Sequence, residues 1–163
     1  LSFVQIVKSN IIKDVLENIE RYSAANNHYV FEITETIEMD QIPAVQNVFK
    51  EFAKNEFRFA IDDFGTGYSN YGYMRDRTFD IVKVDRSFVT DIDKLKDNYL
   101  MVSFIIKMAH EMGLHVCIEG VETKEELSCV KRLGADYIQG YYYGKPVCLQ
   151  DFEEQHLKRF VLG

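Results

Sequence analysis

Helix-like and strand-like patterns of apolar residues alternate along this chain. In some stretches apolar residues recur every three or four positions, which predicts amphipathic helices. Between them lie short runs rich in β-branched and aromatic residues, which favour strands. We expect helices over residues 11–22, 43–54, 97–112 and 123–133 and after residue 149, and strands over 29–34, 57–62, 79–85, 114–118 and 136–140.

The sequence also marks where two of these helices begin or end. Thr123 followed by Glu126 has the spacing of a capping box, in which each side chain accepts a hydrogen bond from the other residue's backbone N–H. Gly134 then ends the same helix, and Gly113 ends the helix before it. A predicted strand closely follows each glycine.

Strands separated by helices indicate a parallel sheet built from βα units. Two closures fit this α/β pattern: an open, doubly wound sheet and a (β/α)8 barrel. A complete barrel takes about 250 residues, whereas this chain has 163. On the barrel interpretation the chain holds about five or six of eight βα units and lacks the first strands.

Polar residues lie at or near the carboxyl end of every predicted strand. In parallel α/β folds these ends meet on one side of the sheet, where active sites form. Asp62 and Asp63 are adjacent, and a turn containing Gly65 and Gly67 follows them. The polar residues at the strand ends are Glu32, Asp62, Asp63, Lys83, Asp85, Glu119 and Gln139.

The charges of this set predict a metal site. Four of its members are the carboxylates of an inner group, and Lys83 supplies one ammonium, so a cleft that holds them would attract cations. Oxygen ligands suit Mg²⁺ or Mn²⁺. Two such metals bridged by one Asp form a common device for phosphodiester hydrolysis, in which Lys83 could orient the water or stabilise developing charge. The four inner carboxylates are those of Glu32, Asp62, Asp63 and Glu119.

Simpler interpretations stay open at this point. Asp favours helix caps and turns, so any one of these carboxylates could serve the backbone alone. Lys83 could simply pair with a carboxylate, and Asp85 with Arg86. Another metal-dependent α/β hydrolase could also carry similar strand ends. The agreement between several strand ends favours the metal site over a set of unrelated caps.

Composition narrows the class of protein. Hydrophobic residues make up 47% of the chain and charged residues 28%, as in ordinary globular domains. A net charge of -7 argues against binding to bulk nucleic acid or anionic membranes. The three cysteines form neither a disulfide framework nor a zinc pattern, and no apolar run approaches the ~20 residues of a membrane span. We therefore expect a cytoplasmic domain, although upstream segments could anchor a parent protein to a membrane.

Five segments around the strand ends form a recognisable set. They follow one another with characteristic spacing across nearly the whole chain, and together they are far more specific than any one alone. By these segments the chain resembles the EAL domain family of bacterial cyclic di-GMP phosphodiesterases. The segments are Phe31-Glu32-Ile33-Thr34-Glu35, Asp62-Asp63-Phe64-Gly65-Thr66-Gly67-Tyr68-Ser69, Lys83-Val84-Asp85-Arg86-Ser87-Phe88-Val89, Glu119-Gly120-Val121-Glu122-Thr123 and Gln139-Gly140-Tyr141 through Pro146.

The resemblance implies a fold and an activity. The fold would be a modified (β/α)8 TIM-type barrel in which one strand runs antiparallel. The activity would be metal-dependent hydrolysis of cyclic di-GMP to linear pGpG, a step of bacterial second-messenger signalling. The protein would then be a cyclic-guanylate-specific phosphodiesterase that forms a homodimer through this domain. An upstream sensory or cyclase domain is a further expectation.

The resemblance also implies which residues hold the metals. A complete site would bind two Mg²⁺ or Mn²⁺ ions. Glu32 and Asp62 would bind the first, with Asp62 bridging to the second, which Asp63 would also bind. Glu35 would stabilise the loop after Asp63, and in the family this loop couples metal binding to dimerisation.

Further residues would act on the substrate side of the site. Lys83 would contact the attacking water. Glu119 would serve as the general base or hold a metal through water, and Gln139 would orient these groups. Asp85 and Glu122 belong to the same motifs and are candidates for substrate contact or another role at the site.

The chain departs from the family at its start. The Glu-Ala-Leu tripeptide that names the family is absent, and Leu1-Ser2 with Gln5 resembles a family segment cut just after a metal-binding Asn. Two first-metal ligands are therefore expected upstream of Leu1. We expect residues 1–163 to be roughly the C-terminal two-thirds of a single EAL domain, weakly active or inactive alone, with no second domain. The alternative is a non-catalytic cyclic di-GMP receptor or protein-interaction module.

Overall fold

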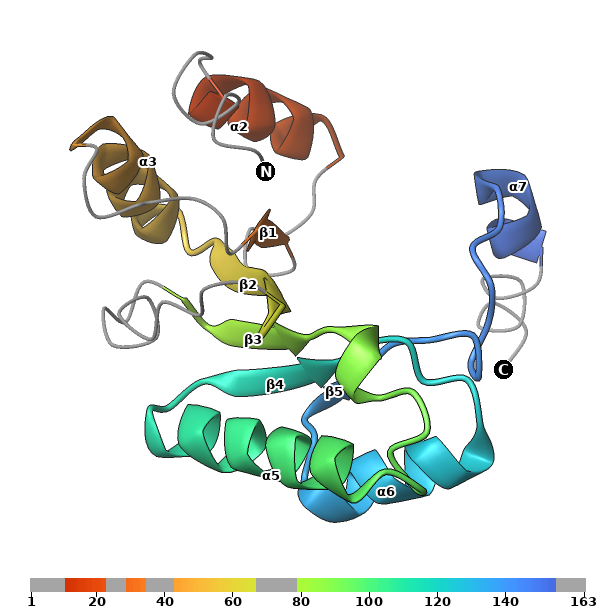
Figure 1. The fold of residues 1–163 in the computed structure, drawn as a ribbon. Coiled ribbons are helices and arrows are strands. Elements are labelled where there is room, and N and C mark those ends of the chain that lie inside the picture. Colours follow the sequence, from red (N-terminus) through yellow and green to blue (C-terminus); the bar gives the residue numbers. More distant parts are fainter. Residues whose placement is uncertain (1–10, 23–28, 35–42, 67–78, 155–163) are drawn as a thin grey trace.

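A five-stranded parallel sheet organises the part of the chain that the structure describes. The computed structural model describes residues 11–22, 29–34, 43–66 and 79–154. The strands lie side by side in sequence order, and the sheet twists from β1 to β5 (Figure 1). They are β1 (Val30–Thr34), β2 (Arg58–Phe64), β3 (Ile81–Val84), β4 (His115–Ile118) and β5 (Tyr137–Ile138).

The strand order decides between the two closures that the sequence left open. A doubly wound sheet reverses its strand order at a switch point, whereas successive strands of a (β/α)8 barrel are always neighbours. Within the described ranges the order β1-β2-β3-β4-β5 has no reversal. The arrangement is therefore that of consecutive βα units of a barrel.

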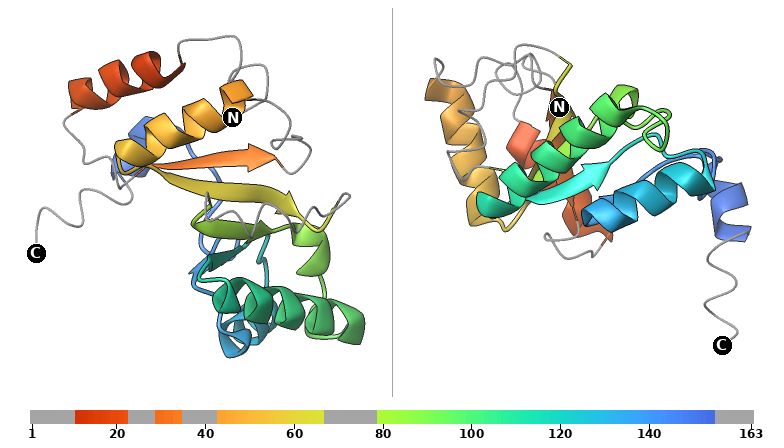
Figure 2. Two further views of the ribbon diagram at one scale, coloured as in Figure 1. Left: turned by 90° about the vertical axis from the view of Figure 1, so that its left-hand side faces the viewer. Right: turned by 60° about the horizontal axis from the view of Figure 1, so that its bottom comes forward.

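Helices cover one face of this sheet. α3 lies against β1 and β2, and α5 and α6 lie against the later strands (Figures 1 and 2). α7 stands away from the sheet near the carboxyl terminus (Figure 1). The helices are α2 (Ile11–Tyr22), α3 (Pro43–Lys54), α5 (Lys96–Glu111), α6 (Lys124–Leu133) and α7 (Leu149–Phe152), with a short 3-10 helix η3 (Arg86–Phe88) after β3.

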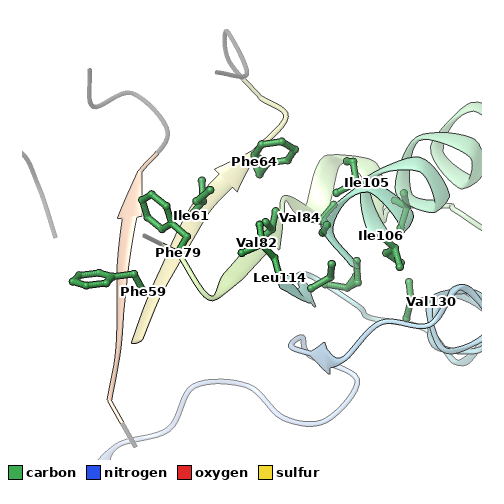
Figure 3. Close-up of a cluster of buried hydrophobic side chains, with 14 of the residues drawn as sticks. Phe59, Ile61, Phe64, Phe79, Val82, Val84, Ile105, Ile106, Leu114 and Val130 are labelled. Carbon is green, nitrogen blue, oxygen red and sulfur yellow. The ribbon is translucent and has the colours of Figure 1, made fainter. Parts of the chain in front are cut away.

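The strands alternate between an apolar face toward the helices and a polar face away from them. Side chains of β-strands point to opposite faces in turn. Ile61 of β2 and Val82 of β3 are register partners on the helix-covered face, and both are buried (Figure 3). Lys83 follows Val82 and so points to the opposite face. This alternation places the charged strand residues together on the face without helices.

Aromatic side chains fill the core beneath α3. Phe52 is fully buried, and its ring meets Phe31 edge to face at a centroid distance of 4.7 Å. Phe49 meets Phe59 at the same distance. Such pairs stabilise by about 0.5–1.5 kcal/mol beyond the burial of their surface. They fix α3 over the strands that carry Glu32 and Asp62.

Most element predictions are confirmed, with shifted boundaries. The capping box forms as expected: the Thr123 side chain accepts from the Glu126 N–H, Glu126 accepts in return, and Gly134 ends α6. The prediction that β2 ends at Asp62 is wrong, because the strand continues to Phe64. The last predicted strand, 136–140, is shorter than expected and comprises Tyr137–Ile138.

Within the described ranges, no helix combines the length and the hydropathy that crossing a membrane requires. The expected cytoplasmic location stays a prediction, and so does the expectation that residues 1–163 belong to a single domain.

The aromatic core yields a test of the fold. Phe52→Ala should lower the free energy of unfolding by about 3–5 kcal/mol, because it empties a fully buried position. Leu149→Ala is the matched control: its side chain is 72% exposed, so the change should stay within about 0.5 kcal/mol. Chemical denaturation of both variants measures the two values. Equal losses would contradict the packing described here.

Candidate metal centre

Lys83 stands at the centre of the charged cluster. Its side chain projects from β3 and is only 7% exposed. Its Nζ lies 2.7 Å from Glu32 Oε1, 2.8 Å from Asp62 Oδ1 and 2.8 Å from Glu119 Oε1. These partners come from β1, from β2 and from the residue after β4. One ammonium therefore joins four neighbouring segments of the sheet.

The carboxylates keep Lys83 charged despite its burial. Burial disfavours the ammonium and would lower the pKa of Lys83. The hydrogen bonds to Asp62, Glu119 and Glu32 outweigh that cost and hold the pKa above its usual range. Lys83 is thus a permanent cation at neutral pH, and the prediction that it lies among the carboxylates is confirmed.

A β-bulge brings the two adjacent aspartates to one site. Consecutive strand residues normally point to opposite faces. Between β2 and β3 the register shifts: Ile61 pairs with Val82, but Phe64 pairs with Val84, so β2 holds one extra residue. Asp63 adopts a left-handed conformation with φ 54° within this stretch. The extra residue changes the direction of the backbone, so the Asp62 and Asp63 side chains both lie at the carboxyl end of the sheet.

Three carboxylates form a candidate ligand set. Each of Asp62, Asp63 and Glu119 offers one oxygen, and these oxygens lie within 4.8 Å of one another. Asp62 and Glu119 are partly buried, whereas Asp63 is exposed. An all-oxygen set of this kind suits a hard divalent cation such as Mg²⁺ or Mn²⁺.

The pKa shifts show that one lysine does not balance the cluster. Asp63 is exposed, but partial desolvation raises the pKa of its carboxyl, and the neighbouring charge of Asp62 raises it further. Burial also raises the pKa of Glu119, although Lys83 opposes that shift. The single ammonium therefore does not offset the burial and mutual repulsion of these carboxylates. A divalent cation among them would supply the missing positive charge, so the residues present fit a metal.

Gln139 and Lys83 share an open hollow on the same face. The hollow has a volume of about 230 Å³, and Glu32 and Cys117 also line it. Gln139 follows β5 directly, and its backbone N–H donates to the Ile118 carbonyl at 2.8 Å. The structure therefore places Gln139 on the side of the sheet that carries the cluster, as expected.

Asp85 and Glu122 make contacts outside the carboxylate set. The Asp85 carboxylate accepts from the Ser87 N–H at 2.9 Å and so caps η3. Glu122 lies 4.0 Å from Arg86 across the surface. These are loop-supporting contacts, and substrate contact by either residue stays a prediction. Glu35 lies outside the described residues.

Sequence reasoning missed two features of the site. The bulge was not expected, although adjacent carboxylates that must serve one site are a signal for it. Glu126 was identified as a helix-capping residue, but it also accepts the Asp91 N–H at 3.1 Å from a different loop. A capping box gives no sign of such a long-range partner.

Comparison with known sequences identifies a family and its curated members. The family model described as "EAL domain" matches residues 1–146. The probable cyclic di-GMP phosphodiesterase PdeA of Escherichia coli (strain K12) is 34% identical over 146 residues, which are 90% of this chain and 20% of PdeA. The chain spans about a fifth of the length of three such curated relatives and 37% of the length of another, PdeL of the same strain.

Solved structures of EAL proteins share the fold. The structure of the EAL enzyme Bd1971 with cAMP and cyclic di-GMP bound matches with a TM-score of 0.87 and 32% identity, covering 94% of this chain and 41% of that one. The EAL domain of Mycobacterium smegmatis DcpA matches with a TM-score of 0.88 and 28% identity, covering 97% of this chain and 71% of that one. The described sheet is therefore part of an EAL-type (β/α)8 barrel.

Asp63 allows the charge of the site to be separated from its backbone shape. Asn tolerates the left-handed conformation at least as well as Asp. Asp63→Asn should therefore keep the thermal stability while weakening Mn²⁺ binding by at least about 10-fold. Asp93→Asn, which removes an exposed carboxylate elsewhere, should leave Mn²⁺ affinity unchanged. Titration calorimetry with Mn²⁺ measures both, and equal affinities in the two variants would remove Asp63 from the ligand set.

Proposed function

The chain belongs to the EAL domain family, and on that premise we propose that it takes part in the metal-dependent hydrolysis of cyclic di-GMP to linear pGpG. Relatives named as cyclic di-GMP phosphodiesterases support this proposal. The similarity to Bd1971, an EAL enzyme whose structure holds cyclic di-GMP, supports it as well. The enzyme class would be a cyclic-guanylate-specific phosphodiesterase.

One observation carries the proposal: three carboxylates of the proposed site converge, and a permanent cation lies beside them. Asp62, Asp63 and Glu119 converge within 4.8 Å, and Lys83 touches two of them. A receptor that only binds the nucleotide has no need for this concentration of like charge. The mutual repulsion of these carboxylates is unfavourable unless cations offset it. An enzyme that needs bound metal ions for hydrolysis would supply those cations.

In the proposed site, Glu32, Asp62 and Asp63 would hold two metal ions, with Asp62 contributing to both. Mg²⁺ or Mn²⁺ would supply Lewis acidity toward a phosphate oxygen and a water molecule. The β2 bulge places Asp62 and Asp63 side by side. Glu32 Oε1 lies 2.7 Å from the Lys83 ammonium, which neighbours them. Glu35 would stabilise the loop that follows.

Lys83, Glu119 and Gln139 would handle the water and the developing charge. The Lys83 ammonium can donate to the attacking water or to a phosphate oxygen. The raised pKa of Glu119, caused first by burial, brings its carboxylate closer to the basicity that proton abstraction needs. Gln139 would orient these groups from the same hollow. Asp85 and Glu122 would support the substrate from the surrounding loops.

Turnover of cyclic di-GMP tests the proposal. The assay uses the chain in its natural sequence context, including any residues before Leu1, with Mg²⁺ or Mn²⁺. Asp62→Asn should abolish turnover together with metal binding. Lys83→Met should spare metal binding at saturating metal, because the bound cation then supplies the positive charge that the carboxylates share. It should lower kcat about 10²–10³-fold, the loss that follows removal of one transition-state donor.

The outcomes separate the enzyme from a receptor. If the folded, metal-loaded protein binds cyclic di-GMP but does not hydrolyse it, the protein is a receptor and the proposal is wrong. Normal kcat in Lys83→Met would contradict the role assigned to that ammonium.

We also propose that a second copy of the chain binds the outer face of α5. Leu100, Met101 and Phe104 are 53%, 46% and 58% exposed on this helix. Asp97 and Lys107 lie at the two ends of this apolar stripe. In an antiparallel pair of α5 helices, one two-fold axis brings Leu100 to Phe104 and Asp97 to the partner's Lys107. The face is thus apolar at its centre and complementary to itself in charge at its two ends.

Charge exchange tests this dimer. Asp97→Lys places two lysines opposite each other and should weaken dimerisation, and Asp97→Lys combined with Lys107→Asp should restore it. Phe104→Glu should give monomers at concentrations where the unaltered chain is dimeric. Sedimentation velocity reports the mass in each case. An unaltered chain that stays monomeric at high concentration would overturn the interface. A double variant that dimerises no more tightly than Asp97→Lys alone would overturn it as well.

A further inference from the structure

Glu126 is a buried carboxylate with more partners than its helix requires. The residue is 5% exposed. A capping box asks for one bond, from the backbone N–H of the cap residue, and Thr123 supplies it at 3.1 Å. Two further backbone groups also donate to Glu126: the Glu122 N–H at 2.9 Å and the Asp91 N–H at 3.1 Å. Helix capping therefore does not explain the bonds from Glu122 and Asp91.

The additional donors belong to two different loops. Asp91 lies in the loop after β3, the strand that carries Lys83. Glu122 lies in the loop after β4, three residues beyond Glu119. Asp91 also holds a left-handed conformation with φ 55°, a shape that persists only where its surroundings fix it. The Glu126 carboxylate therefore connects the loop that follows Lys83 to the loop that contains Glu119 and Glu122.

The same two loops are in close contact at Gly120. With φ 71°, a Cβ added there would lie 2.4 Å from Arg86 Cβ, so the two loops approach so closely that no side chain fits between them at this position. Val121 is fully buried, and its N–H donates to the Gln139 carbonyl at 3.2 Å. The segment that Glu126 fastens thus also contacts the third loop of the site.

We propose that Glu126 is a positioning residue that fixes Glu119 against Lys83 by holding these loops together. Glu119 leaves β4 with its own N–H bonded to the Val84 carbonyl at 3.1 Å, and the loop beyond it is held by Glu126. The position of Glu119 is therefore fixed from both sides. The geometric claim stands independently of the proposed function, whereas its effect on turnover rests on that function.

The carboxylate chemistry at this position is specific. An ionised carboxylate only accepts hydrogen bonds, so both of its oxygens can face N–H groups. Burial alone would raise the pKa of Glu126, but the bonds from Glu122, Thr123 and Asp91 outweigh it and lower the pKa. A glutamine can keep the capping box through its oxygen, but its NH₂ group must then face the Asp91 N–H. Glu126→Gln therefore removes the hydrogen bond from the Asp91 N–H and keeps the bond from the Thr123 N–H that caps the helix.

Thr123→Ala is the matched control, because it does the reverse. It removes the bond from the Glu126 N–H to Thr123 Oγ1 at 3.2 Å and leaves all three bonds to the carboxylate. Amide hydrogen exchange by NMR, on folded samples of the chain, compares the two variants. Glu126→Gln should speed exchange of the Asp91 and Glu119 amides about 10-fold or more. Thr123→Ala should leave both amides protected.

Mn²⁺ affinity and turnover extend the test. Glu126→Gln should weaken Mn²⁺ binding and lower kcat about 10–100-fold, as loss of a second-layer partner does, and Thr123→Ala should not. Protection of Glu119 that is unchanged in Glu126→Gln, or lost equally in both variants, would overturn the positioning role. Unaltered protein that fails to hydrolyse cyclic di-GMP would refute the proposed function, and the exchange result would still decide this one.

Discussion

The contact between the Lys83 ammonium and three carboxylates is the interaction on which the site depends. Ion pairs that are buried add little net stability, because desolvation offsets their attraction. Here they fix the positions of the three carboxylates around Lys83. Glu32, Asp62 and Glu119 come from three separate segments, and their negative charges would drive them apart without a shared cation. Lys83 holds them at hydrogen-bonding distance and leaves the remaining negative charge for a metal.

Two backbone features complete this arrangement. The bulge in β2 turns an adjacent pair of aspartates into co-ligands, which a regular strand would send to opposite faces. The parallel pairing of the strands brings the carboxyl ends of all described strands to one side of the sheet. Glu126 then links the loops that leave this side. The apolar face of the sheet, packed under α3, α5 and α6, provides the rigid support that such a site needs.

The sequence predicted the helices, the strands and most members of the cluster, because these follow from local periodicity and from the polar residues at strand ends. The identity of Lys83, Asp62 and Glu119 as neighbours followed from the convergence of parallel strands. The bulge was not predicted, although the adjacent aspartates and the step from Ile61 to Phe64 in the buried positions of β2 are signals for it. The reach of Glu126 to Asp91 was equally hidden, because it depends on loop packing between residues far apart in the chain. Periodicity alone left the barrel and the open sheet both possible. The resemblance to the EAL family predicted the barrel, and the strand order confirms it.

The central claim is that the carboxylates around Lys83 form a divalent-metal site. Anomalous diffraction at the manganese edge, from crystals of this chain grown with Mn²⁺, tests it most directly. The account predicts an anomalous peak bonded to the carboxylates of Asp62 and Asp63, with the Lys83 ammonium beside it. Ordered carboxylates at saturating Mn²⁺ without a peak between them, or a peak only elsewhere on the molecule, would contradict it.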